Sequence, residues 1–244
     1  MKHPTVRFQV NPREDIHALE GFVSDAHYDD GAALEDAVFS VVPAFRKYFK
    51  NNRTKLKARA EISRYIEAYY KENSSRVKTD MQAYAKAWKK IAPKYFALVK
   101  EIFGNAPWPK GKYTAYPTMW RMFPRNLKDK TFQVPVLFRR NKLVPVIVAH
   151  ELLHFMFYSY LFKVLPELSK ERNELLAWNI SELFNSVVQT TPRWKKAFGM
   201  VPRDYDYHTK VLRALRKKYT EVDSDNRDQL IEELVMRAKN LNGG

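Results

Sequence analysis

The sequence predicts an α+β fold with a large helical N-terminal portion and a small sheet in the second half. Residues 55–70 and 80–102 place apolar and aromatic side chains on one face with helical periodicity. Residues 112–120 and 131–138 are rich in aromatic and β-branched side chains, as strands are. A twenty-residue, mostly apolar run follows at residues 143–162, which is too long for an ordinary strand and predicts a helix.

The N-terminal half is predicted to contain one short strand and three helices. Thr5–Val10 alternates enough to be a strand. Ala32–Tyr48 is typical of a helix bent at Pro43, and the two periodic segments 55–70 and 80–102 follow. Pro93 is expected to kink the last of these helices, because proline removes a backbone donor. Glu72–Arg76 is predicted to be the loop between them.

A mainly antiparallel sheet is expected after the breaker Gly104–Gly111. The strand-like segments Lys112–Trp120 and Thr131–Phe138 flank a polar turn region, Phe123–Lys130, so they are predicted to pair antiparallel. Pro135 cannot donate a ladder hydrogen bond, and its strand is therefore expected at a sheet edge.

Four helices are predicted in the C-terminal part. The first begins at the N-cap residue Asn141 and runs to about Val164. The second runs from Ser169 to about Gln189, and two more fill residues 207–219 and 225–240. The predicted domains are a helical N-terminal region, 1–104, and a region 105–244 that contains the sheet and a helical tail, or one continuous domain.

The composition excludes several classes of site. The chain has no cysteine, which rules out a disulfide framework, a cysteine nucleophile and a thiolate metal site. The N-terminal residues contain no apolar run, so no secretory signal is expected and a cytoplasmic location is predicted.

The formal net charge is +16, and residues 46–100 alone carry sixteen Lys or Arg against four Asp or Glu. Such a surface favours an acidic protein, a nucleic acid or an anionic membrane face, or it is simply a solvated helix surface.

The apolar run Leu143–Phe162 has the length of a transmembrane helix. However, His150, Glu151 and His154 lie near its centre, and a carboxylate at the middle of a bilayer costs about 2.5–3.5 kcal/mol. No second segment of comparable apolarity exists to form a bundle. We therefore expect a buried core helix and no transmembrane segment.

The three polar residues in this run form the pattern H-E-x-x-H, "HELLH" at His150–His154. Residues four apart on a helix project from the same face, so both imidazoles can bind one zinc ion. Glu151 lies about 100° around the helix from His150, where a general base for a metal-bound water is expected. The alternative is a pair of core histidines hydrogen-bonded to the backbone, with Glu151 bonded to one of them.

Two histidines leave a catalytic zinc site incomplete, because such sites usually have three protein ligands and one open position. The remaining histidines are His3, His17, His27 and His208. The second predicted helix offers three carboxylates: Glu171, Glu174 and Glu182.

These residues resemble the gluzincin metallopeptidases, a zincin-like family whose pattern is HExxH followed, about twenty residues later, by an Asn-Glu pair. Here "NELLAW" at Asn173–Trp178 places Glu174 twenty residues after His154. The resemblance covers residues 146–182 and implies that His150, His154 and Glu174 are zinc ligands and that Glu151 is the catalytic base. It also implies an active-site helix beside a second, ligand-bearing helix.

The chain departs from the family pattern at Trp178, where the family has an aspartate that orients the first histidine. Glu182 or a backbone carbonyl is the alternative partner for His150, and Glu182 is also an alternative third ligand.

The resemblance further implies a downstream residue that stabilises the tetrahedral intermediate, for which His208 is a candidate, with a polar helix cap as the alternative. It implies an edge strand that pairs with an extended peptide substrate, for which Val134 and Val136 are candidates.

The sequence thus predicts a zinc-dependent metallopeptidase that acts on a peptide or protein substrate. The basic surface is compatible with an acidic substrate. Two alternatives remain open. The chain is a basic, nucleic-acid-associated protein with a structural or regulatory zinc site, or it is an inactive zincin fold kept for protein contacts.

Overall fold

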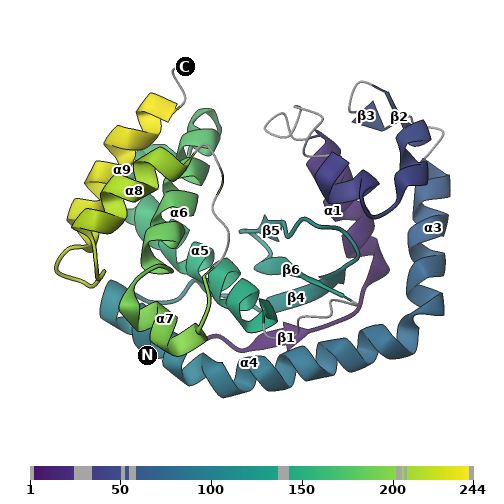
Figure 1. Cartoon of the computed structure of the whole chain (residues 1–244), viewed down its shortest axis with the longest axis horizontal. Helices are drawn as coiled ribbons and strands as arrows, with labels where there is room; N and C mark the ends of the chain where they lie inside the picture. Colours follow the sequence, from purple (N-terminus) through teal and green to yellow (C-terminus); the bar gives the residue numbers. More distant parts are fainter. Residues whose placement is uncertain are drawn as a thin grey trace. The chain divides into compact units, whose positions relative to one another are not determined.

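The computed structural model describes residues 3–24, 35–50, 53–54, 59–136, 143–201, 205 and 208–241. The predicted N-cap residue Asn141 and His27 lie outside this set. The structure is α+β and mostly helical, with a small four-stranded sheet (Figure 1).

The chain forms two compact units that interleave along the sequence. The sheet unit comprises residues 5–86 and 111–144, and the helical unit comprises residues 1–4, 87–110 and 145–244. The predicted division has a single boundary after residue 104, whereas each unit here draws on segments from both sides of that position.

The sheet has the strand order β1-β4-β6-β5 and is mixed, not mainly antiparallel as predicted. β1 (Val6–Phe8) pairs parallel with β4 (Tyr113–Thr118), and β4 pairs parallel with β6 (Thr131–Pro135). The prediction is wrong because a short strand, β5 (Arg125–Asn126), lies inside the presumed turn and forms the antiparallel pair with β6. The tight turn therefore joins β5 to β6, which leaves β4 and β6 running in the same direction.

The predicted substrate strand is β6, and its groups are already used inside the sheet unit. The side chains of Val134 and Val136 are buried. The backbone N–H of Val136 donates to Thr118 O in β4 at 3.0 Å, so this group does not serve an added strand as expected. The edge position predicted for the strand of Pro135 is wrong, because β6 lies between β4 and β5. β5 pairs only with Thr131 and Phe132, so Pro135 lies beyond the paired part on that side, where no ladder donor is needed.

Helices cover the rest of the sheet unit. They are α1 (Pro12–Ser24), α3 (Arg59–Glu72) and the first part of α4 (Ser74–Phe103). Two short strands of the same unit, β2 (Phe49–Lys50) and β3 (Arg53–Thr54), pair antiparallel with each other. The single helix predicted over residues 32–48 is wrong within its described part, which holds a π-helical turn, η2 (Glu35–Phe39), and a 3-10 helix, η3 (Pro43–Tyr48). Pro43 starts η3 rather than bending a longer helix, because the first helical position needs no N–H.

A buried carboxylate ties α1 to the neighbouring elements of the sheet unit. Asp15 is fully buried and accepts hydrogen bonds from Thr118 Oγ1 at 2.5 Å, Tyr70 Oη at 2.9 Å and Met119 N at 3.0 Å. Burial raises the pKa of Asp15 to about 6 against the lowering effect of these three donors.

The pKa of Asp15 makes the stability of the chain depend on pH. Between pH 3.8, the ordinary pKa of this carboxyl, and about pH 6, Asp15 is protonated in the folded chain and mostly ionised in the unfolded chain. The free energy of unfolding therefore falls as the pH rises through this window, by about 3 kcal/mol from this group. Urea unfolding of the wild type and of Asp15→Asn between pH 4 and 7 measures the difference. Equal pH dependence of the two proteins would contradict the assignment.

The helical unit is built around α5 (Val144–Val164), which contains the HELLH motif. α5 is long and apolar enough to cross a membrane by length and composition, yet 72% of its most apolar window is buried inside the protein. A helix that is apolar all round is typical of a protein core.

The rest of the helical unit surrounds α5. Two 3-10 turns, η6 (Pro166–Ser169) and η7 (Glu171–Asn173), lead into α6 (Glu174–Val188), so α6 begins five residues later than the predicted start at Ser169. α7 (Pro192–Phe198), α8 (Thr209–Lys218), α9 (Arg227–Leu241) and the second half of α4 complete it. Phe157 of α5 stacks on Phe184 of α6 with ring centroids 4.3 Å apart, which fixes the two helices side by side.

Candidate metal centre

The two motif histidines converge as the helical spacing predicts. The rings of His150 and His154 lie one turn apart on α5, and their Nε2 atoms are 3.0 Å apart. His154 is fully buried, whereas the His150 side chain is 20% exposed. The pair therefore has one fully enclosed histidine and one that reaches solvent.

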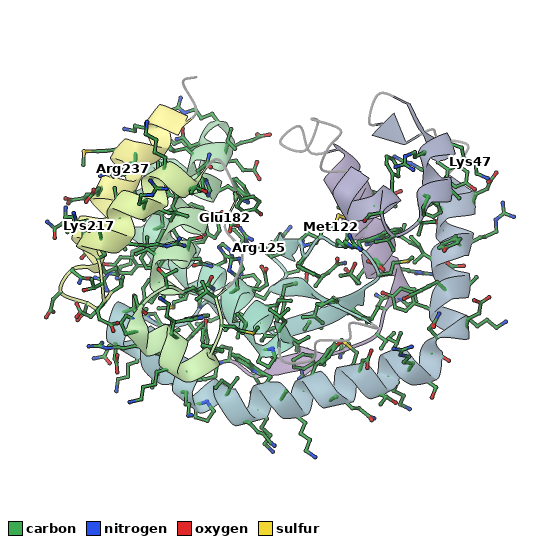
Figure 2. All side chains as sticks on the ribbon, in the orientation of Figure 1. Lys47, Met122, Arg125, Glu182, Lys217 and Arg237 are labelled. Atoms are coloured by element: carbon green, nitrogen blue, oxygen red, sulfur yellow. The ribbon has the colours of Figure 1, made fainter. Side chains whose placement is uncertain are left out.

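The carboxylate that joins the histidines is Glu182 of α6 (Figure 2). Its Oε1 lies 3.3 Å from His154 Nε2, and its Oε2 lies 3.6 Å from His150 Nε2. The potential ligand atoms of the three residues all lie within 4.8 Å of one another. Glu182 is 4% exposed, and such a buried charge requires a partner.

Glu174, the third ligand that the family resemblance implies, does not lie with this group. It is the first residue of α6 and is exposed. Eight residues separate it from Glu182, which is about 12 Å along the helix axis. The donor types are those of the gluzincins, two histidines and a glutamate, but the structure brings together His150, His154 and Glu182.

The three residues form a group that could hold a metal ion. A tetrahedral zinc with ligand bonds near 2.05 Å separates its ligand atoms by about 3.3 Å. The two Nε2 atoms are 3.0 Å apart, and Glu182 Oε1 lies 3.3 Å from His154 Nε2, whereas the 3.6 Å contact with His150 Nε2 is made by the other oxygen, Oε2. Two imidazole lone pairs and a buried carboxylate that face one another repel unless a cation or a proton lies between them.

A row of polar side chains on α6 holds the imidazoles in place. Ser181 Oγ lies 2.6 Å from His154 Nδ1, and Gln189 Oε1 lies 3.2 Å from His150 Nδ1. Asn185 Nδ2 donates to the backbone oxygen of His150 at 3.1 Å. These residues recur every four positions, so they form one stripe along α6. We call them the α6 polar ladder.

The ladder can hold the histidine tautomer that binds metal. When Nδ1 of His154 carries the proton, it donates to Ser181 Oγ, and Nε2 keeps its lone pair for a cation. His150 Nδ1 lies 3.2 Å from Gln189 Oε1 and 3.0 Å from Gln189 Nε2, so Gln189 supports the same tautomer when its oxygen accepts the Nδ1 proton. The partner that the family supplies with an aspartate is thus Gln189 here, and not Trp178 or Glu182. Trp178 instead packs against His208 and Tyr205.

Removing a rung of the ladder is expected to weaken metal binding. Ser181→Ala and Gln189→Ala each lose the acceptor of an Nδ1 proton, so the zinc affinity should fall about 10–100-fold. Ser186→Ala changes the same helix outside the ladder and is the matched control. Competition with a chromophoric chelator measures all three. Unchanged affinity in both ladder variants would show that the hydrogen bonds do not support the histidines.

The other predicted site residues are placed as follows. Glu151 is 3% exposed and follows His150 directly on α5. His208 is fully buried at the start of α8 and lies 2.9 Å, through Nε2, from Asn179 Oδ1. It is therefore not the surface cap that the alternative interpretation expected, and it is not a member of the histidine–glutamate group.

The ladder residues were not identified from the sequence. Ser181, Asn185 and Gln189 are polar residues at a spacing of four, in or next to a helix whose other residues are mostly apolar. That pattern indicates a polar stripe on a buried face, and Glu182 lies next to its first member. The stripe was the available signal that the carboxylate belongs to this part of α6 and not to its N-terminus.

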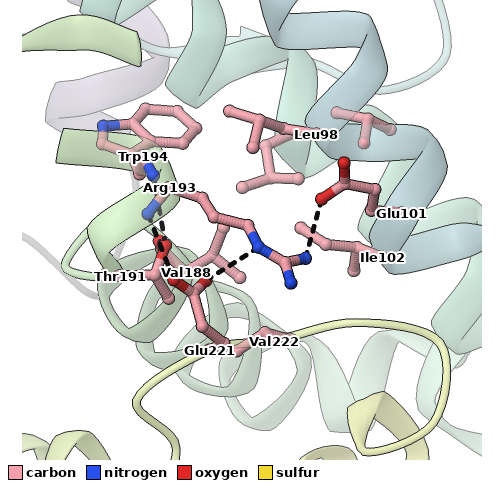
Figure 3. A pocket seen from close by; sticks show the side chains of 11 residues that line it. Leu98, Glu101, Ile102, Val188, Thr191, Arg193, Trp194, Glu221 and Val222 are labelled. Atoms are coloured by element: carbon pink, nitrogen blue, oxygen red, sulfur yellow. Dashed lines mark hydrogen bonds and ion pairs between the residues drawn. The ribbon is translucent and has the colours of Figure 1, made fainter. Parts of the chain in front are cut away.

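A separate cavity in the helical unit is too small to bind a substrate. Its volume is about 10 Å³, which is room for one water molecule (Figure 3). Leu98, Leu153 and Trp194 line it, and Arg193 pairs with Glu101 at 2.7 Å and with Glu221 at 3.7 Å beside it. It contains no catalytic constellation.

No family model, no curated protein and no solved structure matches this chain.

Proposed function

We propose that this chain is a zinc-dependent metallopeptidase in which His150, His154 and Glu182 hold the metal. The observation that carries the proposal is the convergence of these three side chains from α5 and α6, with separations that suit one tetrahedral ion. Two histidines and one glutamate are a ligand set of catalytic zinc.

The number of ligands favours catalysis over a structural role. Structural zinc sites almost always have four protein ligands, usually with cysteine among them. This chain has no cysteine, and the group found among the described residues has three members. The fourth position of a tetrahedral ion is then left for a water molecule, and the partly exposed His150 gives that side access to solvent.

Glu151 is proposed as the general base. Zinc, when bound, lowers the pKa of a water ligand to about 7. With that water at the site, Glu151 would accept its proton as the oxygen bonds to the carbonyl carbon, and would return the proton to the leaving amine as the C–N bond breaks. Its burial suits this task, because a carboxylate shielded from bulk water interacts more strongly with a nearby proton donor.

The test is metal-dependent proteolysis. The purified chain should hydrolyse an unfolded protein such as labelled casein, lose this activity with a zinc chelator and regain it on addition of zinc. Zinc binding at about one ion per chain without hydrolysis of any peptide would support a metal site and refute the peptidase.

A further inference from the structure

One side of α4 is rich in positive charge, most of it in the cluster Lys86, Lys89, Lys90 and Lys94. All thirty residues of this helix are described, so the face is defined along its whole length. Six exposed basic residues project from the side opposite its buried residues Tyr84, Trp88 and Tyr95. They are Arg76, Lys78, Lys86, Lys89, Lys90 and Lys94.

We call these six residues the α4 basic face. Figure 2 shows side chains with nitrogen tips pointing away from α4 along this side.

Acidic side chains do not neutralise the lysines of this face between Lys86 and Lys94. Between Met81 and Lys100 the helix contains no Asp or Glu. Asp80 is partly exposed and lies one turn from Arg76, about 40° around the helix, but about 120° from Lys86. Among the described residues, none of the six basic side chains forms an ion pair. In contrast, Arg193, Lys218 and Arg237 on other helices are paired with glutamates.

The face lacks the side chains that a protein or membrane partner needs. Protein interfaces depend on apolar and aromatic anchors, and interfacial membrane helices insert an apolar face. The apolar side of α4 is buried, and the exposed large apolar residues of the described chain lie elsewhere. The exposed neutral residues of the face are small or polar: Thr79, Gln82, Ala83, Pro93 and Ala97.

The ligand that matches a line of point charges without anchors is a regular polyanion. Five of the six residues are lysines, which bind phosphate as point charges and read no bases. Single-stranded nucleic acid additionally needs exposed aromatic side chains for base stacking, and α4 exposes none. The phosphate backbone of a duplex requires only the charge.

We propose that the α4 basic face binds double-stranded DNA through its phosphates without sequence preference. This proposal is independent of the metal centre, because it uses one face of one helix and no residue of the histidine–glutamate group.

The test compares two variants of equal net charge. In the first, Lys86, Lys89, Lys90 and Lys94 are changed to glutamine, which keeps the helix propensity of lysine. In the control, four exposed lysines outside α4 are changed in the same way: Lys195, Lys196, Lys210 and Lys217. Binding of the full chain to a labelled duplex of about twenty base pairs is measured from 50 to 200 mM salt. Circular dichroism checks the fold.

Each phosphate contact contributes about −0.9 to the slope of log affinity against log salt. The slope of the α4 variant should therefore be smaller in magnitude by about 3.6. Between 50 and 200 mM salt, the affinity of the wild type should then fall about 150-fold more than the affinity of the variant. The control variant should keep most of the wild-type slope.

Several results would overturn the proposal. Equal losses in both variants would mean that net charge alone attracts DNA. Absence of duplex binding at 50 mM salt, tighter binding to a single strand, or binding only to anionic phospholipid vesicles would each exclude the duplex as the ligand.

Discussion

Glu182→Ala should leave the chain unable to retain zinc through dialysis, whereas wild type retains about one ion per chain. Loss of a supporting residue alone lowers metal affinity about 10–100-fold, so loss of a ligand is expected to lower it more than about 100-fold. The remaining histidines keep their 3.0 Å Nε2 separation on α5, but they lose the negative charge that offsets part of the cation's charge.

The matched control is Glu174→Ala, which removes the same side chain from the same helix. Because Glu174 is exposed at the first turn of α6, this variant should bind zinc as wild type does. Metal analysis after dialysis and chelator competition measure both proteins. The reverse outcome, with zinc lost in Glu174→Ala and kept in Glu182→Ala, would assign the ligand to the position implied by the gluzincin pattern.

Glu151→Gln should keep zinc and lose hydrolysis. The change preserves the size of the side chain and removes the carboxylate that accepts the proton of the water. The contribution of a positioned general base is typically about 10²–10⁴-fold, and the rate of casein hydrolysis should fall by that factor. A metal-to-protein ratio equal to that of wild type is the control, since it shows that the ligands are intact. Full activity of a zinc-loaded Glu151→Gln protein would exclude Glu151 as the base.

The sequence predicted the half of the site that depends on local geometry. His150 and His154 are four residues apart, and one turn of any regular helix brings them together. Glu182 depends on where α6 begins and how it packs on α5. The 3-10 turns η6 and η7 move the start of α6 to Glu174, and contacts such as Phe157 with Phe184 set which turn of α6 faces the histidines. The spacing of the motif residues specifies neither the residue at which α6 begins nor the turn of α6 that faces the histidines.

The sheet shows the same difference between features set by local sequence and features set by how distant segments pack. β-branched and aromatic content located β4 and β6, because composition is a property of each strand alone. Their relative direction depends on β5, a strand of two residues that is too short to show any periodicity. α1 was not predicted because its apolar face is narrow, with Ala18 and Leu19 buried beside Asp15. Asp15 itself is stabilised by partners more than fifty residues away in the sequence.

X-ray absorption at the zinc edge tests the central claim most directly, with one equivalent of zinc added to the wild-type chain. The first coordination shell should contain two imidazole nitrogens at about 2.0–2.1 Å and a carboxylate oxygen at about 2.0–2.2 Å. The oxygen should be altered in Glu182→Ala and unchanged in Glu174→Ala. A spectrum of fully hydrated zinc, without imidazole scattering, would contradict the metal centre and the hydrolase proposed from it.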